Sequence, residues 1–338
     1  LEFRRVLFRS FCSVVVFLER IVKQAAANPG LHHPNRCEFV GGRHERIAVD
    51  QQEIGPSAKR EPAQPAFGEQ GLGDQIMFAS CFNEVIDQAG RVIIECNPKL
   101  VALFQRSFPK AQIQENVPAG QEPRWLEDAG QIDFQIAMGD LPGMYRNRWE
   151  DFPAHSGYLF ADQSRVEHWK TRLAALGSEY TLGISWRGGS IATRRHMRSL
   201  TLEQMLPILH LPLRAISLQY DPVDAELSAF RESSGMEVIH WQDAIDDYDE
   251  TAALVSALDG VVTVCTAAVH LAGALGKKTW VVAPLVTEWR YLEEGQKLPW
   301  YPSVTLIRQR TPGSWSGAIE ETRQTLAMEL ARRADSSR

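Results

Sequence analysis

Late in the chain, a short polar turn lies between two apolar stretches, and its residues could bind an anion. Val261 to Val264 is a β-branched run that predicts a buried strand, and Thr266 stands where the N-cap of a following helix is expected. His270 lies one turn further along the same helix face, so both side chains could reach one ligand. Because the free N–H groups of a helix start suit a phosphate, Thr266, Ala267 and His270 are candidate phosphate ligands. The alternative is a core unit in which His270 only satisfies a local hydrogen bond.

A second turn whose residues could bind a ligand or take part in a reaction is Gly71-Leu72-Gly73-Asp74. It precedes a helix that the apolar pattern predicts over Gln75 to Ala89. A glycine turn at a helix start can also cradle a phosphate or another ligand. Asp74 is an isolated carboxylate that could take the proton from a hydroxyl group. The alternative is a carboxylate that only caps the helix and stabilises it by about 1 kcal/mol.

A basic loop follows the strand that is expected over Tyr180 to Trp186. It contains Arg187, Arg194, Arg195 and Arg198. Arginines in such a loop would offset the negative charge that grows on a leaving phosphate. A solvated, charge-rich surface loop is the alternative reading of these four residues.

The elements that must position these residues alternate between strand-like and helix-like segments, which predicts an α/β fold. We expect two Rossmann-like domains that face a cleft, over residues 67–175 and 176–331, with ligands at the carboxyl ends of the strands. Strands are expected at 91–96, near 113, and at 132–138, 180–186, 214–219, 237–240, 261–264, 279–283 and 304–308. Helices are expected at 75–89, 99–107, 165–176, 202–209, 225–233, 249–258 and 316–331, and loops at 141–156 and 285–302. Gly276 is expected to end the helix that begins after Thr266.

Residues 1–66 do not follow this alternation. Val6 to Ser10 resembles the translation of a common sequencing-adapter end, so we expect a scar there and a missing true start. Residues 11–27 are predicted to form a helix. Residues 31–66 show almost no periodicity, which predicts linker or disorder.

Composition excludes several classes of protein. A net charge of −6 provides no basic field for nucleic acid, and no apolar run approaches the roughly 18 residues that span a bilayer. The five cysteines show neither a CxxC motif nor metal-ligand spacing, which favours the cytoplasm and no metal. The P-loop, the GxSxG elbow, and GxGxxG with an acidic partner are missing from the sequence. P-loop NTPases, α/β-hydrolases and nicotinamide dehydrogenases are therefore disfavoured.

Several short motifs, taken in order, resemble a known family. They are Glu69 to Asp74, Gly183 to Gly189, Arg198 to Leu200, Ser217 to Gln219, Thr266 to Gly276, Glu288 to Arg290 and Pro299 to Pro302. The set is similar to the glycosyltransferase module that follows tetratricopeptide repeats in many bacterial proteins. That module is similar to the family 9 lipopolysaccharide heptosyltransferases, and the resemblance covers residues 67–331.

The resemblance implies a GT-B fold and inverting, metal-independent transfer of a sugar from a nucleotide-diphosphate donor to a glycan or protein hydroxyl. The nucleotide sugar is then a substrate, and no cofactor is expected. By position in the motifs, Asp74 in the first, acceptor-binding domain matches the family's proposed base. Thr266, Ala267 and His270 match the donor-diphosphate turn of the second domain, and Arg198 falls near a basic residue that contacts donor phosphate. Trp186, Arg187 and Gln219, at the ends of the strands expected over 180–186 and 214–219, are further candidates for donor binding.

Two departures from the family pattern leave alternatives open. Cys265 stands where the pattern has Asp before Thr, and residues 57–67 are charged and contain Pro62 and Pro65 where the family has an apolar strand. Either a frame error has replaced that strand, which we favour, or the first sheet lacks its first strand. The alternative function is a non-catalytic module that binds a sugar nucleotide or a partner. A nucleotide-sugar epimerase, which would need other cleft carboxylates, is a third possibility.

Overall fold

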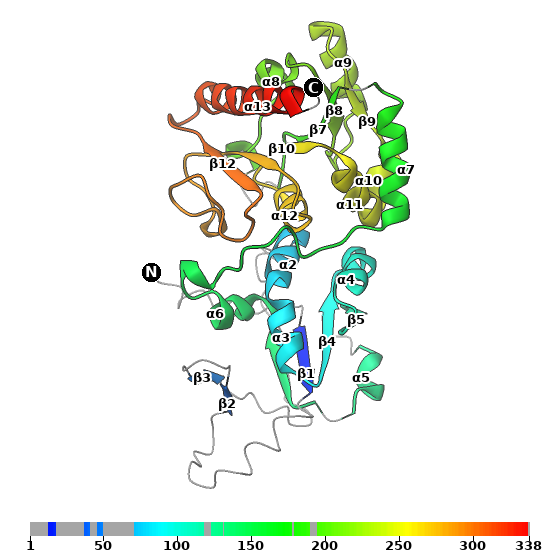
Figure 1. Cartoon of the computed structure of the whole chain (residues 1–338), viewed down its shortest axis with the longest axis vertical. Helices are drawn as coiled ribbons and strands as arrows, with labels where there is room; N and C mark the ends of the chain where they lie inside the picture. Colours follow the sequence, from blue (N-terminus) through cyan, green and yellow to red (C-terminus); the bar gives the residue numbers. More distant parts are fainter. Residues whose placement is uncertain are drawn as a thin grey trace. The chain divides into compact units, whose positions relative to one another are not determined.

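The computed structural model describes residues 13–17, 37–40, 46–49, 71–117, 123–130, 132–177, 179–189 and 195–336. It divides into two compact units, Leu1–Asp151 and Phe152–Arg338, which are described separately (Figure 1). Of the expected features, the adapter-like residues 1–10, the prolines Pro62 and Pro65, and Arg194 lie outside the described residues.

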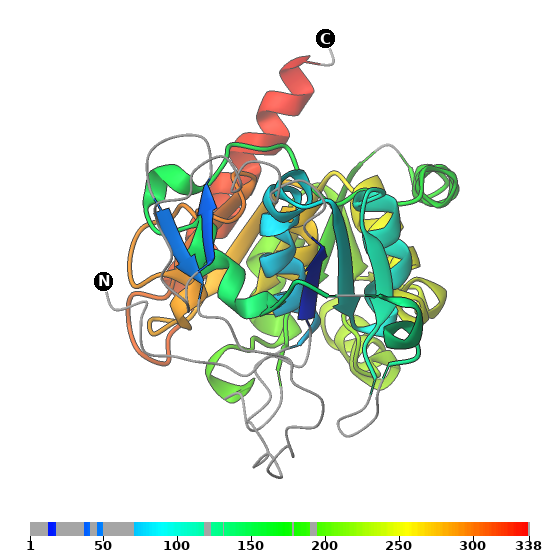
Figure 2. The same ribbon diagram turned by 90° about the horizontal axis from the view of Figure 1, so that it is seen from below.

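The first unit contains a four-stranded sheet in the order β5-β4-β1-β6. Its strands are β1 (Ser13–Phe17), β4 (Arg91–Cys96), β5 (Gln112–Glu115) and β6 (Phe134–Ala137). The strands β4 and β5 are parallel, whereas β1 is antiparallel to both of its neighbours, β4 and β6. Figure 2 shows β1, in dark blue, beside β4. The strand expectations for 91–96, 113 and 132–138 are therefore confirmed.

One of the two inner strands of this sheet, β1, is a segment that we predicted to be helical. The prediction of a helix over residues 11–27 is wrong at Ser13–Phe17, which contains three consecutive valines. Valine is stiff at χ1 and favours extended backbone. The sheet thus has a strand at its centre, but it is antiparallel and distant in sequence from the glycine turn at Gly71. The expected linker over 31–66 also contains an antiparallel pair, β2 (Cys37–Val40) and β3 (Arg46–Val49).

The first unit also contains short helices. They are α2 (Leu72–Phe78), η1 (Ala79–Cys81), α3 (Phe82–Gln88), η2 (Pro98–Leu100), α4 (Val101–Ser107), α5 (Trp125–Asp128), η3 (Met138–Asp140), α6 (Leu141–Tyr145) and η4 (Trp149–Asp151). Phe82, Phe104 and Phe108 pack edge to face and are buried. The expected loop over 141–156 is wrong at α6, where Pro142 occupies the first turn of a helix, a position that tolerates proline.

The second unit contains a six-stranded parallel sheet in the order β12-β11-β10-β7-β8-β9. Its strands are β7 (Tyr180–Ser185), β8 (Leu213–Ser217), β9 (Val238–His240), β10 (Gly260–Val264), β11 (Thr279–Ala283) and β12 (Val304–Arg308). The strands β8 and β9 follow β7 on one side of the sheet, whereas β10, β11 and β12 lie on its other side. The strand order therefore reverses between β7 and β10. Open α/β sheets bind ligands at the carboxyl ends of the strands beside such a reversal.

Helices of the second unit cover the sheet (Figure 1). They are α7 (Gln163–Ala174), η5 (Arg195–Met197), α8 (Leu202–Leu209), α9 (Asp224–Ser234), α10 (Gln242–Asp246), α11 (Tyr248–Ala257), α12 (Ala267–Ala274), η6 (Trp289–Tyr291) and α13 (Ser316–Ser336). The helix α13 packs against α8 and the strands β11 and β12, while α7 packs against α11. The core between sheet and helices contains Trp186, Met205, Phe230, Trp280 and Leu326, all nearly inaccessible.

The helix α7 belongs to the second unit, although we expected the first domain to extend to residue 175. Trp169 of α7 is buried and donates from Nε1 to the Glu250 carboxylate of α11 at 2.8 Å. Arg165 of α7 forms ion pairs with Asp247 and Glu250 at 2.7 and 2.8 Å. These contacts explain why the division falls between Asp151 and Phe152 rather than after α7.

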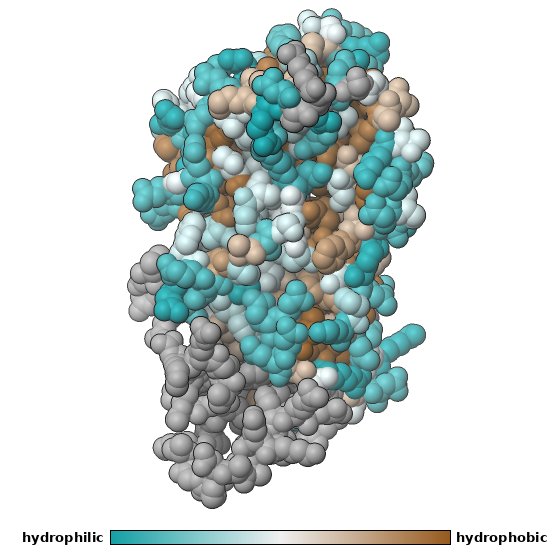
Figure 3. Space-filling view, in the orientation of Figure 1, coloured by the Kyte–Doolittle hydropathy of each residue, from teal (hydrophilic) through white to brown (hydrophobic). Residues whose placement is uncertain are grey.

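Hydrophilic residues, in teal, cover much of the face drawn in Figure 3. Among the described residues, none of the helices combines the length and the apolar composition that a membrane crossing requires.

Candidate functional site

The candidate site lies in the second unit, where β7 and β10 end side by side. The strand β7 leads into Trp186, Arg187 and Gly188, and β10 leads through Cys265 into Thr266 and α12. The two turns are in close contact: a Cβ atom added to Gly188 would lie 2.0 Å from Cγ2 of Thr266. Only glycine fits at position 188 without displacing its neighbour.

The start of α12 presents a backbone donor at this edge. Thr266 is the N-cap, as expected, and its Oγ1 accepts a hydrogen bond from the Ala268 N–H at 3.1 Å. The Val269 N–H donates to the Thr266 carbonyl at 3.1 Å. The Ala267 N–H has no acceptor in the described parts of the chain. Gly276, with φ of +71°, follows the helix end as expected.

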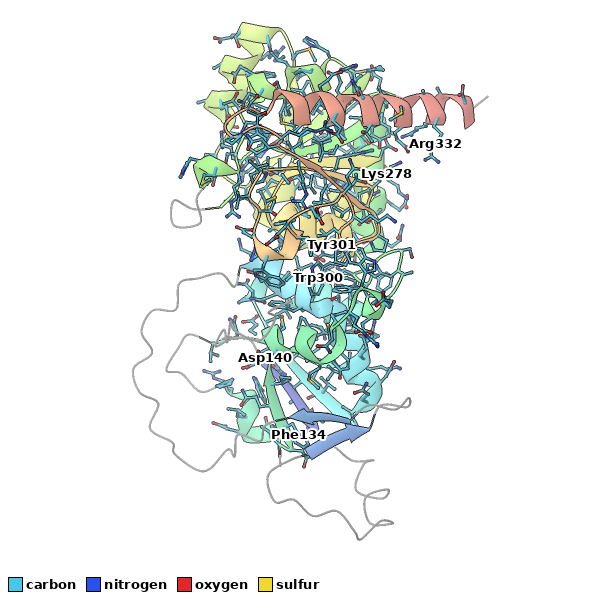
Figure 4. All side chains as sticks on the ribbon, turned by 90° about the vertical axis from the view of Figure 1, so that its left-hand side faces the viewer. Phe134, Asp140, Lys278, Trp300, Tyr301 and Arg332 are labelled. Carbon is cyan, nitrogen blue, oxygen red and sulfur yellow. The ribbon has the colours of Figure 1, made fainter. Side chains whose placement is uncertain are left out.

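His270 lies deeper in the unit than we expected. Its ring is buried, with Nδ1 at 3.0 Å from the Tyr301 hydroxyl and Nε2 at 3.3 Å from the Tyr291 hydroxyl. Figure 4 shows Tyr301 beside Trp300 on the loop before β12. Burial, together with the positive charge of Arg290, lowers the pKa of His270 well below its usual value. A neutral imidazole with both nitrogens engaged supports α12 from inside, so the expected direct contact with a diphosphate does not fit this geometry.

Arginines gather where β10, β11 and β12 end. Arg198 and Arg290 both pair with Glu288, the latter at 2.8 Å. Arg308, at the end of β12, donates instead to backbone carbonyls of Tyr291 at 2.5 Å and of Gly295 at 2.9 Å. Among the described residues, Glu288 is the carboxylate that pairs with both Arg198 and Arg290.

Cys265 lies within electrostatic reach of this cluster. Burial raises the pKa of its thiol to about 12, with a further increase from Glu288 and opposing effects from Arg198, Arg290 and Arg308. The thiol is therefore neutral at physiological pH. In contrast to an Asp at this position, Cys265 leaves the positive charge of the arginines undiminished.

The three remaining expected residues at the strand ends have structural partners. The Gln219 side chain is fully buried and binds the backbone of Arg187, accepting from its N–H at 3.2 Å and donating to its carbonyl at 3.0 Å. Trp186 is buried and donates to Glu226 at 2.9 Å, and the Arg187 guanidinium also pairs with Glu226. These contacts fix the turn that carries Gly188.

Other members of the basic loop have separate partners. Arg195 of η5 pairs with Asp221. Among the described members of this loop, Arg187, Arg195 and Arg198 each pair with a different carboxylate.

The first unit holds Asp74, Gly71 and Gly73 at the start of α2. Asp74 is only 8% exposed, and its Oδ2 accepts a hydrogen bond from the Gly71 N–H at 3.2 Å. This is the capping interaction of our alternative reading, with the carboxylate at the third helical position. Gly71 has an extended backbone that other residues also adopt, and a Cβ atom would meet nothing within 4 Å there. Gly73 is buried in the first turn.

Sequence reasoning missed the role of the loop between β11 and β12. This loop carries Glu288 and Arg290, which form an ion pair. It also carries Tyr291 and Tyr301, whose hydroxyl groups contact His270. The signal was present, since Glu288 to Arg290 and Pro299 to Pro302 are among the motifs of the resemblance. Within the described residues, no group of three or more His, Cys, Asp or Glu side chains is arranged to hold a metal ion.

Comparison with known proteins links this fold to glycosyltransferases. The crystal structure of the glycosyl transferase family 9 from Veillonella parvula DSM 2008 matches with a TM-score of 0.54 and 11% identity, covering 77% of this chain and 94% of that one. E. coli ADP-heptose lipopolysaccharide heptosyltransferase II matches with a TM-score of 0.41 and 11% identity, over 59% of this chain and 62% of its own. The expected GT-B-like α/β fold of the family 9 type is therefore confirmed.

A sequence relative is the protein FlbA of Caulobacter vibrioides, which is 31% identical over 261 residues. The match covers 73% of this chain and 43% of FlbA, so the chain spans less than half of that relative. No family model matches the chain. The association with tetratricopeptide repeats stays a prediction.

Proposed function

We propose that this protein is a glycosyltransferase that takes a sugar from a nucleotide-diphosphate donor and attaches it to a hydroxyl of a glycan or a protein. The observation that carries the proposal is the start of α12, at the reversal point of the parallel sheet, where the Ala267 N–H has no acceptor among the described residues. The helix dipole and this donor favour a phosphate at that point. The family 9 fold supports the same reaction class.

The donor binds at the edge of the second unit, with its diphosphate at Thr266 and Ala267. Arg198, whose side chain is 12% exposed, supplies positive charge from the neighbouring loop. As the bond to the sugar breaks, negative charge accumulates on the leaving nucleoside diphosphate. The helix start and the arginines offset that charge, which is the part a metal ion has in other transferases.

Asp74 is the proposed general base. Inverting transfer is a single displacement in which the acceptor oxygen attacks the anomeric carbon from the side opposite the diphosphate. The Asp74 carboxylate accepts the acceptor proton as that bond forms. Its burial and its hydrogen bond from Gly71 fix its position in the first turn of α2. Among the described residues, Cys81, Cys96 and Cys265 form no disulfide, which supports a reducing compartment such as the cytoplasm.

A binding module without catalysis is the second candidate. It is favoured by the capping role of Asp74, which gives that carboxylate a structural reason to be present. The two candidates share the donor site and differ only in turnover.

Measurements on the whole chain test the proposal. A panel of nucleotide sugars is screened by calorimetry, and donor consumption is followed with and without EDTA. The variant Ala267→Pro removes one N–H donor but suits the first position of a helix, so α12 should form while donor affinity falls about tenfold. Asp74→Asn should keep donor affinity and lose at least a hundredfold in turnover.

Matched controls separate these effects from loss of fold. Gln163→Pro places the same residue at the first position of α7 and should leave donor binding unchanged. Asp87→Asn removes an exposed carboxylate from α3 and should leave turnover unchanged. Donor binding without turnover in the unaltered protein would favour the binding module. Failure of every nucleotide sugar to bind would refute the donor site.

A further inference from the structure

Glu288 holds two arginines that come from separate parts of the chain. Its Oε1 pairs with Nη1 of Arg198, which follows η5, and its Oε2 lies 2.8 Å from Nη1 of Arg290 on η6. One carboxylate thus bridges two guanidinium groups, each through a different oxygen. A phosphate group can make the same pair of contacts, because it also presents several oxygens to guanidinium donors.

Solvent reaches the three side chains unequally. Those of Arg198 and Arg290 are 12% and 10% exposed, whereas that of Glu288 is 32% exposed. The carboxylate is therefore the most accessible member of the group. An anion that approaches the two guanidinium groups from solvent has to compete with it.

Among the described residues, the side-chain partners of Glu288 are Arg198 and Arg290. Glu288 lies between β11 and β12, directly before the three-residue η6. The preceding Leu285 and Val286 are 42% and 72% exposed. Arg308 secures the loop at other points, through the Thr287 hydroxyl at 3.2 Å and the Tyr291 carbonyl at 2.5 Å. The Glu288 side chain can turn outward while these contacts persist.

Charge favours the exchange of Glu288 for a phosphate. The guanidinium groups of Arg198, Arg290 and Arg308 carry three positive charges, and the neutral thiol of Cys265 cancels none of them. Glu288 contributes a single negative charge to this group. A phosphate with nearly two negative charges would neutralise more than the single carboxylate does, and at low exposure such pairs are weakly screened by salt.

We propose that Arg198 and Arg290 form an anion-binding pair and that Glu288 is its displaceable counter-ion. The carboxylate occupies the pair until a phosphate of the donor takes its place. This inference rests on the proposed function, since it assigns the displaced position to a donor phosphate. The Glu288 carboxylate then competes with the donor phosphate for the two guanidinium groups and weakens donor binding. In the absence of donor it balances part of their positive charge.

The test uses inorganic pyrophosphate and a nucleoside diphosphate as probes, with affinities measured by calorimetry at low salt on the whole chain. Glu288→Gln should bind pyrophosphate about tenfold more tightly than the unaltered protein, because the competing charge is gone. Glu293→Gln removes an exposed carboxylate from the same loop and should change the affinity less than twofold. Unchanged or weaker pyrophosphate binding by folded Glu288→Gln would overturn the proposal.

A measurement on the unaltered protein guards against misfolding of the variant. In a crystal structure with pyrophosphate, we expect a phosphate within hydrogen-bond distance of Arg198 and Arg290, with Glu288 turned away. Pyrophosphate bound elsewhere, with Glu288 still bridging the arginines, would overturn the proposal.

The outcomes also separate this inference from the proposed function. If Glu288→Gln tightens pyrophosphate binding but no nucleotide sugar binds, the anion pair stands and the glycosyltransferase proposal fails. If nucleotide sugars bind and react while Glu288→Gln has no effect, only the counter-ion proposal fails. If no anion binds to either protein, both are refuted.

Discussion

Nδ1 of His270 lies 3.0 Å from the hydroxyl oxygen of Tyr301, inside the second unit. Tyr301 also packs against α12 from the side: a Cβ atom added to Gly273 would lie 2.3 Å from Cγ of its ring. Together with the bond from Nε2 to Tyr291, these contacts tie α12 to the loop between β11 and β12. The helix α12, whose N-terminus is the proposed phosphate site, and the loop that carries Glu288 and Arg290 are therefore one packed structure.

The buried His270 makes stability depend on pH. Burial lowers the pKa of this imidazole well below the value of about 6.5 expected in the unfolded chain. Below pH ~6.5 the imidazole binds a proton in the unfolded state but not in the folded state. The contribution of His270 to the free energy of unfolding is therefore full above that pH and decreases below it. We expect a loss of about 1.4 kcal/mol per pH unit from this residue.

Urea unfolding at pH 7.5 and 5.5 measures this loss. His270→Asn keeps a polar side chain between the tyrosines but cannot titrate, so its free energy of unfolding should decrease by about 1.4 kcal/mol less than that of the unaltered protein over this interval. His210→Asn, which alters an exposed histidine after α8, is the control and should preserve the full decrease. An identical pH dependence in His270→Asn would show that the imidazole is not held neutral.

Gly188 and Thr266 form a contact that can be broken and repaired. In Gly188→Ala the new Cβ would meet Cγ2 of Thr266, which must displace the N-cap and weaken both stability and donor binding. Thr266→Ser removes that methyl group and keeps the capping oxygen. The double variant should therefore recover most of the loss, as measured by thermal unfolding and calorimetry.

Gly317→Ala is the control for this pair. A Cβ atom at Gly317, in the first turn of α13, meets nothing within 4 Å, so alanine should stabilise the helix by up to about 1 kcal/mol. If Gly188→Ala lowers stability and donor affinity equally with and without Thr266→Ser, position 188 does not lie against Cγ2 of Thr266.

Gln219 fixes the turn after β7 through two hydrogen bonds to the backbone of Arg187. Gln219→Leu leaves that N–H and carbonyl without these partners and should destabilise the protein by about 2 kcal/mol or more in urea unfolding. Gln324→Leu, on the exposed face of α13, should change stability by less than about 0.5 kcal/mol. If Gln219→Leu is as stable as the unaltered chain, these bonds do not hold the turn.

The contacts of α7 predict which fragment of the second unit folds alone. A fragment of residues 152–336 retains the contacts that Trp169 and Arg165 of α7 make with Glu250 of α11. It should therefore unfold cooperatively. A fragment of residues 176–336 exposes the surface of α11 that Trp169 covers and leaves Glu250 without both partners. We expect it to aggregate or to lose cooperative thermal unfolding in circular dichroism. Equal cooperativity in both fragments would contradict the assignment of α7 to this unit.

Local chemistry in the sequence determined much of the second unit. The β-branched run in β10, the capping oxygen of Thr266 and the stop at Gly276 act within a few residues, so strand, turn and helix were predicted correctly. The order of apolar segments also implied a parallel sheet with ligands at its carboxyl edge. In the first unit, the same reasoning misassigned Ser13–Phe17, because the pairing partners β4 and β6 are far away in the sequence.

Tertiary structure alone decided the chemical state of the candidate site. The sequence placed His270 on the same helix face as Thr266, but only packing against Tyr291 and Tyr301 buried its ring and kept it neutral. Likewise Arg198 and Glu288 are 90 residues apart and meet only because separate loops end at the same edge of the sheet. Burial and pairing depend on contacts between distant segments, and residue spacing does not encode those contacts directly.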